Sequence, residues 1–275
     1  MSEENPTLTM IRKFVSIGRA ELPGRPHTVG GDPDAQRALV FGMQAVGDDG
    51  TPIEIGGALL DLLAPRAPYF DQLVVDAITS GVTQIVNIGV GFDDRALRFR
   101  DPHVTFFEID LAHVIDEKRS QLEKAGADQT GLVLAAADLH IDDIGEVLNR
   151  AGHDRSKPSL FLAEHLFLFL EQLDVEILLT GMAGSAAPGS VLAVTAEVHP
   201  EGFDSAEVLS TADQVMFGGT SPLHTILSRE TWLTLFADSG WTVKDVGILT
   251  AVDHFAVPVD GQTAQIQTQF LTATI

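Results

Sequence analysis

A glycine turn and a pair of carboxylates have the spacing of a nucleoside site. The segment QIVNIGVGFDD (residues 84–94) is an apolar run that ends in Gly89 and Gly91. Glycines directly after a strand of a parallel sheet let a ligand approach the backbone. Glu108 and Asp110 follow about 20 residues later, the distance at which an acidic residue binds ribose hydroxyls in nucleotide-binding folds. The combination predicts a ligand that contains a nucleoside.

The two aspartates after the glycines narrow the choice of ligand. Asp94 stands at the third glycine position of the dinucleotide-binding fingerprint, and Asp93 precedes it. Two carboxylates at the start of a helix would repel a phosphate, although at least one of them is expected to cap the helix. A phosphate-free nucleoside with a sulfonium and an ammonium group fits better, and S-adenosylmethionine has this character.

Alternating strands and helices must position these residues. From about residue 69, apolar runs with strand character alternate with segments of helical periodicity. The expected strands are residues 84–90, 104–110, 131–138, 159–165, 190–198, 241–249 and 265–274. This order predicts an α/β, Rossmann-like, seven-stranded and mostly parallel sheet with helices on both faces. No helix is evident before the last strand, so that strand should run antiparallel.

Two regions depart from this alternation of strands and helices. Residues 1–65 are rich in Gly, Pro and Asp with only short helical patches, so we expect an N-terminal cap or arm ahead of a main domain at 66–275. Residues 199–227 form a long connection that contains Gly and Pro, and long loops in such folds tend to be lids or substrate walls. The polar helix at 115–126 is expected to be a solvated face without a chemical role.

Composition excludes several classes of protein. The formal net charge of −22, from 39 acidic and 17 basic side chains, would repel nucleic acid and an anionic membrane surface. There is no cysteine, so there is no disulfide, thiolate metal site or cysteine nucleophile. The first residues lack the layout of a signal peptide, and the apolar runs are too short or too interrupted to span a bilayer. These features predict a cytoplasmic protein.

Four motifs in order resemble the leucine carboxyl methyltransferase family. The motifs are YFDQLVVDAITSGVTQIVNIGVGFDDRALRF, FFEIDLAHVIDEKRSQL, AADL and AEHLFLFL. The family comprises S-adenosylmethionine-dependent O-methyltransferases and includes bacterial enzymes that act on polyketides and other natural products. The resemblance extends from about residue 66 to 198. It implies a class I methyltransferase fold, with S-adenosyl-L-methionine as cofactor and S-adenosyl-L-homocysteine as product.

The resemblance assigns the first cofactor-binding residues to the glycine turn and the second strand. Gly89 and Gly91 would lie under the methionine part of the cofactor, with Asp93 completing the family's Gly-x-Gly-x-Asp turn. Glu108 and Asp110 match the family's Glu-x-Asp, and Asp110 is the expected partner of the ribose hydroxyls.

The remaining cofactor residues come from later strand ends and from the segment ahead of the first strand. Asp138 and Leu139 match the family's Asp-Leu and would flank the adenine, with Asp138 accepting from the exocyclic amine. Glu164 would lie near the positive groups of the cofactor. Arg66, just ahead of the Tyr-Phe pair, is expected to bind the cofactor carboxylate.

His165 and Phe169 depart from the family, which usually has a small residue and a tyrosine there. Methyl transfer from a sulfonium is an in-line displacement, so the protein must align the acceptor and exclude water. A carboxylate acceptor is already ionised at neutral pH, whereas a base accelerates transfer to a phenol or alcohol by roughly 10²–10⁴-fold. His165 is the first candidate base, followed by His224 and His199, although a histidine next to a sheet edge is more often a hydrogen-bonded structural residue.

The acceptor is less well defined. Phe169, with the apolar residues of VMFGG and FAVPV, could wall a flat aromatic or aliphatic molecule, and Arg229 could bind a carboxylate. We therefore expect a small-molecule acceptor. The alternatives are a carboxyl methyltransferase acting on a peptide or protein C-terminus, and a non-catalytic cofactor-binding protein. Histidine spacing gives no support for a metal site, and the G-x-S-x-G motif of serine hydrolases is missing.

Overall fold

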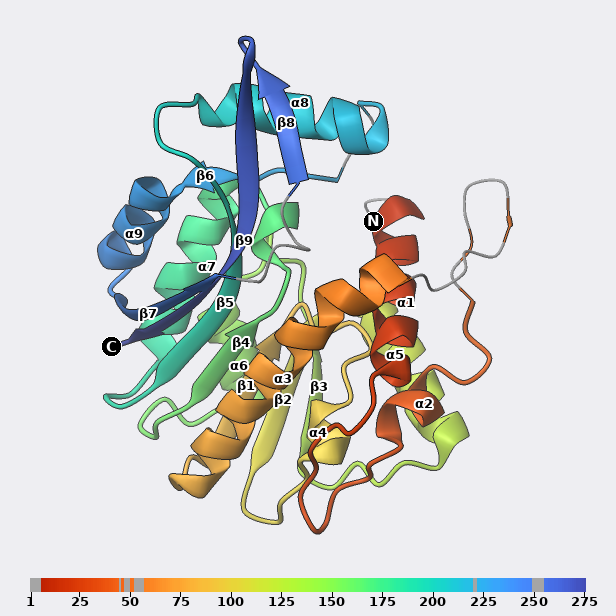
Figure 1. The fold of residues 1–275 in the computed structure, drawn as a ribbon. Helices are drawn as coiled ribbons and strands as arrows, with labels where there is room; N and C mark the ends of the chain where they lie inside the picture. Colours follow the sequence, from red (N-terminus) through yellow and green to blue (C-terminus); the bar gives the residue numbers. More distant parts are fainter. Residues whose placement is uncertain (1–5, 45, 47–49, 52–56, 220–221, 249–254) are drawn as a thin grey trace. The chain divides into compact units, whose positions relative to one another are not determined.

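The chain forms two compact units, which meet in sequence between Asp138 and Leu139. The computed structural model describes residues 6–44, 46, 50–51, 57–219, 222–248 and 255–275. Both units combine strands with flanking helices (Figure 1), and most strand pairs are parallel. The predicted fold class, an α/β protein with a mostly parallel sheet covered by helices, is confirmed.

The first unit contains three parallel strands in the order β3-β2-β1, which are β1 (Gln84–Ile88), β2 (Thr105–Asp110) and β3 (Leu132–Ala136). All of β1 is buried, as expected for a parallel strand that is covered on both faces. Ile88 pairs with Ile109, and Asp110 pairs with Ala136. The carboxyl ends of the strands therefore lie at one edge, where the glycine turn begins.

The helices of the first unit include one that the sequence did not predict. They are α1 (Pro6–Glu21), α2 (Ala35–Leu39), α3 (Gly57–Thr79), α4 (Arg95–Arg98) and α5 (Ala112–Ala125). The expectation of only short helical patches before residue 60 was wrong, because α1 has 16 residues. The predicted boundary between residues 65 and 66 falls inside α3, which continues through Pro65 and Pro68.

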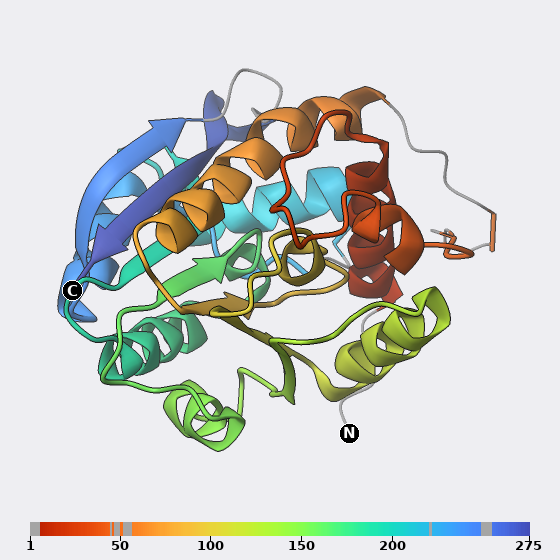
Figure 2. The ribbon, with the colours of Figure 1, turned by 90° about the horizontal axis from the view of Figure 1, so that it is seen from below.

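The N-terminal segment packs on the rest of the first unit. Lys13 of α1 pairs with Glu117 of α5 at 3.1 Å, and Leu39 of α2 shares an apolar cluster with Leu97 of α4 and Leu122 of α5. Figure 2 shows α1 and α2 beside α5. The segment is thus packed into the first unit through an ion pair and a shared apolar cluster.

The second unit has a sheet in the order β4-β5-β9-β7, formed by β4 (Leu160–Ala163), β5 (Val191–His199), β9 (Gln262–Thr274) and β7 (Thr242–Ile248). β4 and β5 are parallel, while β9 runs antiparallel to both β5 and β7, as predicted for the last strand. Two unpredicted strands are β6 (Leu227–Ser228), which pairs with β5, and β8 (Phe255–Val259), which forms a hairpin with β9.

Three helices of the second unit start at side-chain caps. The helices of this unit are α6 (Ile144–Ala151), the short 3₁₀ helix η1 (Phe167–Phe169), α7 (Gln172–Ser185), α8 (Ser205–Phe217) and α9 (Arg229–Asp238). Asp143, Asp204 and Ser228 each accept a hydrogen bond from the backbone N–H three residues later, which fixes where α6, α8 and α9 begin. Among the described residues, no helix has the length and apolarity needed to cross a bilayer.

The expected lid, residues 199–227, contains the unpredicted helix α8. This helix packs beside β8 and β9 (Figure 1) around a separate apolar cluster, which we call the lid core. Its buried members are Leu168, Val208, Ala212, Leu223, Ile226, Val257, Val259, Ala264 and Ile266. The segment is therefore a helix with a hydrophobic centre of its own, shared with the β8–β9 hairpin.

Candidate functional site

The glycine turn after β1 requires glycine at both predicted positions. Gly89 and Gly91 have φ angles of 67° and 51°, in the left-handed region that other residues rarely adopt. The backbone N–H of Gly91 donates to Oδ2 of Asp110 at 2.7 Å, and the N–H of Leu111 donates to Oδ1 at 2.8 Å. Asp110 therefore links the turn to the end of β2.

Asp110 and Asp138 fit the nucleoside part of the expected cofactor. Both are half-buried, Asp110 at the end of β2 and Asp138 two residues after β3. The N–H of Ala137 donates to the backbone oxygen of Asp110 at 2.9 Å, which brings the two strand ends together. Each carboxylate oxygen of Asp110 has a second lone pair, so two oriented oxygens can still accept from vicinal hydroxyls.

Helix α1 covers the glycine turn. A Cβ atom on Gly91 would lie 3.1 Å from Cγ of Arg12, so the Arg12 side chain lies directly over the turn. Arg66, the expected partner of the cofactor carboxylate, is on α3 and has no exposed surface. Arg12 could not be placed here from the sequence, because α1 itself was not predicted.

Asp93 is enclosed by cations. Its Oδ2 accepts from Nη1 of Arg19 at 2.9 Å and also contacts Nη1 of Arg95, while Oδ1 accepts from the N–H of Arg95 at 2.7 Å. Nζ of Lys118 donates to its backbone oxygen at 2.8 Å. Burial opposes ionisation, but Arg95 and Arg19 outweigh it and hold the pKa of Asp93 well below its usual range.

Asp94 and Asp71 complete the same buried network. Arg25 binds both oxygens of Asp94 at 3.0 and 2.9 Å, and Arg98 adds contacts at 3.0 and 3.3 Å. Asp71 on α3 accepts from Arg98 at 2.8 Å and from Arg95 at 2.9 Å. Burial opposes ionisation of Asp94 as well, yet Arg98 and then Arg25 lower its pKa.

The charge argument from the two aspartates was therefore wrong. Asp93 and Asp94 are 3% and 0% exposed, and arginines from α1, the segment after it, and α4 neutralise them. Their charges do not select a cationic ligand. Within the described residues, Asp93 holds the turn, through the N–H of Arg95, and ties it to α1.

Glu108 is also buried and forms an ion pair inside the protein. It is 1% exposed, and its Oε2 lies 2.5 Å from Nζ of Lys118. Burial raises the pKa of Glu108 to about 7, against the opposing effect of Lys118. The expectation that the helix at 115–126 is only a solvated face was wrong, because Lys118 is 1% exposed and holds both β2 and the turn.

In the second unit, His165 has an unusual backbone conformation. It follows β4 and the half-buried Glu164 and has a φ of 55°, in the left-handed region. Its N–H donates to Oγ1 of Thr195 at 2.7 Å, and its ring meets Phe169 edge-on at 5.5 Å between centroids. Nδ1 of His165 is 3.4 Å from Oε1 of Glu197, a buried carboxylate on β5. Leu139, at the start of this unit, is half-buried.

The other two candidate histidines differ in environment. His224 donates its backbone N–H to the oxygen of Leu168 at 2.8 Å, which brings it beside η1, and its Nδ1 is 2.8 Å from Oε1 of Glu171. His199 is 1% exposed, and its ring nitrogens lie 2.8 Å from the Pro200 oxygen and 2.7 Å from Ser205 Oγ. His199 therefore has both nitrogens engaged in holding the start of the lid.

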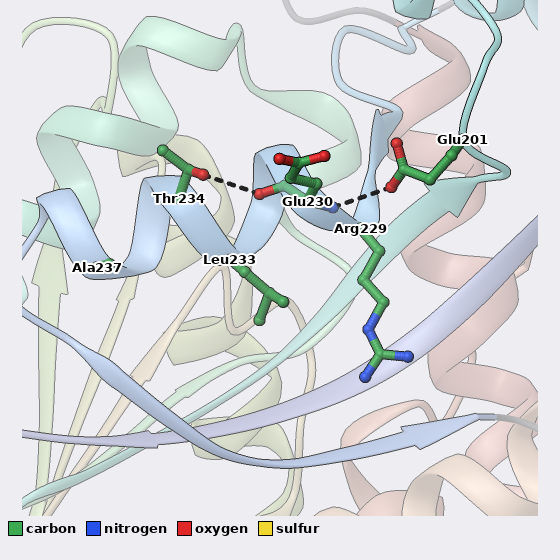
Figure 3. Close-up of a pocket in the computed structure, with 6 residues that line it drawn as sticks. All are labelled: Glu201, Arg229, Glu230, Leu233, Thr234 and Ala237. Atoms are coloured by element: carbon green, nitrogen blue, oxygen red, sulfur yellow. Dashed lines mark hydrogen bonds between the residues drawn. The ribbon is translucent and has the colours of Figure 1, made fainter.

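Arg229 lies in a surface pocket on α9. The pocket is lined by Arg229, Glu201, Glu230, Leu233, Thr234 and Ala237, and Figure 3 shows Arg229 at the start of the helix. Glu201 accepts from the N–H of Glu230 at 3.2 Å. Two glutamates beside the arginine would weaken its attraction for an anionic ligand.

Glu197 is the residue that sequence reasoning missed. It is the one carboxylate in the apolar run SVLAVTAEV, and a buried charge in an apolar strand is unusual enough to have marked it. Arg19 and Arg25 had no comparable signal, since they lie 74 and 69 positions away in the chain from Asp93 and Asp94.

Comparison with known proteins identifies the family of this chain. A model of the leucine carboxyl methyltransferase family matches residues 44–183. A candidate S-adenosyl-L-methionine-dependent methyltransferase of Mycolicibacterium paratuberculosis is 31% identical over 266 residues, covering 90% of this chain and 87% of the relative. One from Mycolicibacterium smegmatis is 30% identical over 274 residues, covering 92% and 90%.

A solved structure shows the same fold at low identity. The magnesium protoporphyrin IX methyltransferase of Synechocystis, solved with S-adenosylhomocysteine, aligns with a TM-score of 0.51 and 11% identity over 86% of this chain and 93% of that one. The relatives and the fold support S-adenosylmethionine as the cofactor, and the residues at the ends of β2 and β3 suit its nucleoside. The chain belongs to the leucine carboxyl methyltransferase family and is an S-adenosylmethionine-dependent methyltransferase.

Proposed function

We propose that this methyltransferase transfers a methyl group to an oxygen atom, a carboxylate or a hydroxyl, of a small molecule. The observation that carries the proposal is His165, held in a left-handed conformation at the end of β4 with its ring against Phe169. Strained backbone positions are retained where the surrounding structure imposes them, and they concentrate at active sites.

The cofactor-binding part of the proposal rests on the first unit. S-adenosylmethionine supplies an electrophilic methyl group when it is bound. Gly89 and Gly91 allow the left-handed backbone of the turn, Asp110 offers two oriented oxygens to the ribose, and Asp138 is assigned to the adenine amine by the family resemblance. Arg66, Leu139 and Glu164 keep the roles that the family resemblance implies, as predictions to be tested.

The acceptor side of the proposal rests on the second unit. Phe169, Phe203, Leu209 and Phe255 are partly buried side chains that pack against the lid core. Apolar and aromatic walls of this kind suit a small, flat acceptor such as a natural product. Of the two segments expected to contribute, FAVPV is the strand β8, whereas Met216 and Phe217 of VMFGG have side chains outside the described part of the chain.

Two alternatives remain distinct from this proposal. A carboxyl methyltransferase acting on a peptide or protein C-terminus would need a cation for the acceptor, and Arg229 shares its pocket with two glutamates. A non-catalytic cofactor-binding protein would bind S-adenosylhomocysteine and transfer nothing.

The test uses cofactor binding and transfer in sequence. Calorimetry should show that the purified protein binds S-adenosylhomocysteine, whereas NAD should give no heat. Incubation with methyl-labelled S-adenosylmethionine and a whole-cell extract, which contains both small molecules and proteins, should then yield a labelled small-molecule product that carries one additional methyl group. Label found only in peptides or proteins would refute the small-molecule proposal, and tight binding without any transfer would favour the non-catalytic alternative.

A further inference from the structure

His165 is held between two side chains of its own unit. Phe169 meets one edge of the imidazole, and Glu197 approaches the buried Nδ1 atom to 3.4 Å. Within the described residues, Nδ1 makes no conventional hydrogen bond, so Glu197 is the acceptor in reach of a proton there. The side chain of His165 is 23% exposed, which leaves part of the ring accessible.

Glu197 is a buried carboxylate with few partners. It is 1% exposed, and its Oε1 accepts from Oγ1 of Thr268 at 3.3 Å. Its Oε2 has no hydrogen-bond partner among the residues that the structure describes. The indole N–H of Trp232 donates to the Glu197 backbone oxygen at 2.9 Å and so fixes the strand behind the side chain. A buried carboxylate that is short of partners is costly, and an N–H donor on the neighbouring imidazole would offset part of that cost.

We propose that Glu197 is a positioning residue that keeps a proton on Nδ1 of His165, so that Nε2 is the base for a hydroxyl acceptor. The inference rests on the proposed function and narrows its acceptor from oxygen nucleophiles in general to phenols, enols or alcohols. A carboxylate acceptor needs no base, and it would be repelled by Glu197. In many enzymes a carboxylate on a neighbouring residue fixes the tautomer of a histidine by accepting a hydrogen bond from one ring nitrogen.

In the proposed step the acceptor hydroxyl loses its proton as its oxygen gains the methyl group. The acceptor hydroxyl gives its proton to Nε2 of His165, while its oxygen bonds to the methyl carbon and the electron pair of the broken carbon–sulfur bond stays on sulfur. His165 becomes an imidazolium that Glu197 stabilises, and it then releases the proton to water. A positioned base of this kind contributes roughly 10²–10⁴-fold to the rate.

The direct test is the tautomer of His165 in the protein without acceptor. Nitrogen–proton correlation spectra of protein labelled in the histidine rings should show the neutral ring protonated on Nδ1. His165→Asn assigns the signal by its loss, and asparagine suits the left-handed backbone. Glu197→Gln should move the proton towards Nε2. A wild-type ring protonated on Nε2, or a tautomer unchanged by Glu197→Gln, would overturn the proposal.

A second histidine–carboxylate pair in the same unit provides the control. Nδ1 of His140 lies 2.5 Å from Oδ2 of Asp174 on the surface. Asp174→Asn should alter the His140 signal and leave that of His165 in place. If Asp174→Asn moved the His165 signal equally, the effect of Glu197→Gln would not be local and the proposal would fail.

A second test measures steady-state kinetics with the acceptor that the incubation with extract identifies. With a hydroxyl acceptor, Glu197→Gln should lower kcat by about 10²-fold or more, with the Kd for S-adenosylhomocysteine and the KM for the acceptor little changed. Identification of a carboxylate acceptor would overturn the base proposal while leaving O-methyl transfer intact. Lack of S-adenosylhomocysteine binding by the wild type would instead refute the proposed function, whatever the His165 tautomer.

Discussion

The substitution Asp94→Asn tests whether the buried arginine–aspartate network holds the first unit together. Asp94 has no exposed surface and receives four contacts of 2.9–3.3 Å from Arg25 and Arg98. Asparagine has nearly the same shape but no charge, and its amide group would face a guanidinium. Of the carboxylates in this network, Asp71 would then remain near both arginines, at 3.8 Å from Nε of Arg25 and 2.8 Å from Nη2 of Arg98.

The size of the effect follows from burial. Removing one partner of a buried ion pair costs about 3–5 kcal/mol, because the remaining charge is left uncompensated. That is a large part of a typical stability of about 5–15 kcal/mol. Asp116→Asn is the matched control, since Asp116 pairs with Arg119 at 2.7 Å on the surface of α5 with 73% of its side chain exposed. An exposed pair of this kind contributes about 0–1 kcal/mol.

Urea unfolding at neutral pH, followed by circular dichroism, measures both variants. The pKa of Asp94 lies below its usual value in the folded protein, so its contribution is present above the unfolded pKa and is lost as the pH falls through the folded value. Asp94→Asn should therefore also remove part of the acid sensitivity of the wild type. A loss of less than about 1 kcal/mol, no larger than for Asp116→Asn, would refute the view that this network stabilises the turn.

Four further predictions concern the turn, the strand ends and the left-handed histidine. Gly91→Ala would place a Cβ atom at a positive φ and close to Arg12, so it should raise the Kd for S-adenosylhomocysteine at least about tenfold. The control is Gly126→Ala: Gly126 also has a positive φ, but its added Cβ would meet no neighbouring atom, so the Kd should be unchanged. Asp110→Asn should raise the Kd for S-adenosylhomocysteine by about 10–100-fold in calorimetry, since hydrogen bonds to a charged group are worth about 1.5–3 kcal/mol. The control Asp101→Asn should leave that Kd unchanged. Burial raises the pKa of Glu108 to about 7 in the folded protein, so between about pH 4.5 and 7 the folded protein keeps a proton that the unfolded chain has lost. The contribution of Glu108 to stability is therefore present at acidic pH and is lost as the pH rises through 7. Glu108→Gln should flatten the pH dependence of the unfolding free energy between about 4.5 and 7 by on the order of 3 kcal/mol, and a curve parallel to that of the wild type would contradict this. His165→Gly should be more stable than His165→Ala by about 1 kcal/mol in thermal unfolding, because only glycine adopts the left-handed backbone freely; equal stabilities would show that the position is not strained.

Most of the sheet could be predicted from the sequence because β1 to β5 are largely apolar runs and β7 and β9 carry apolar residues among polar ones. All seven expected strands are present, and the antiparallel last strand followed from the missing helix before it. β8 was missed because Pro258 and its short length hide its strand character, and β6 has two residues. The helices α1 and α8 were missed because their apolar residues are interspersed with polar and charged ones, and nearby glycines and prolines read as loop.

The site was predictable where it depends on local backbone chemistry. Gly89 and Gly91 adopt the conformations that only glycine favours, and Asp110 ends its strand beside them, as the spacing indicated. What could not be predicted is how charges pair across long stretches of chain. Asp93 looked like an open negative charge until Arg19 of α1 was placed against it. His165 was noticed as a departure from the family and Glu197 could have been noticed as a lone carboxylate in an apolar strand, but that the two side chains face each other follows only from the pairing of β4 with β5.

Apart from Leu168, the lid core lies outside the part of the second unit that the family model matches. Its apolar residues come mainly from α8, β8 and β9, whereas the family match ends at residue 183, before α8 begins at Ser205. Substitutions within this small cluster can repack against one another and reshape the surroundings of Phe169 without altering β4, β5 or their register. Descendants of one ancestral methyltransferase could thus diverge in acceptor through changes confined to α8 and the β8–β9 hairpin.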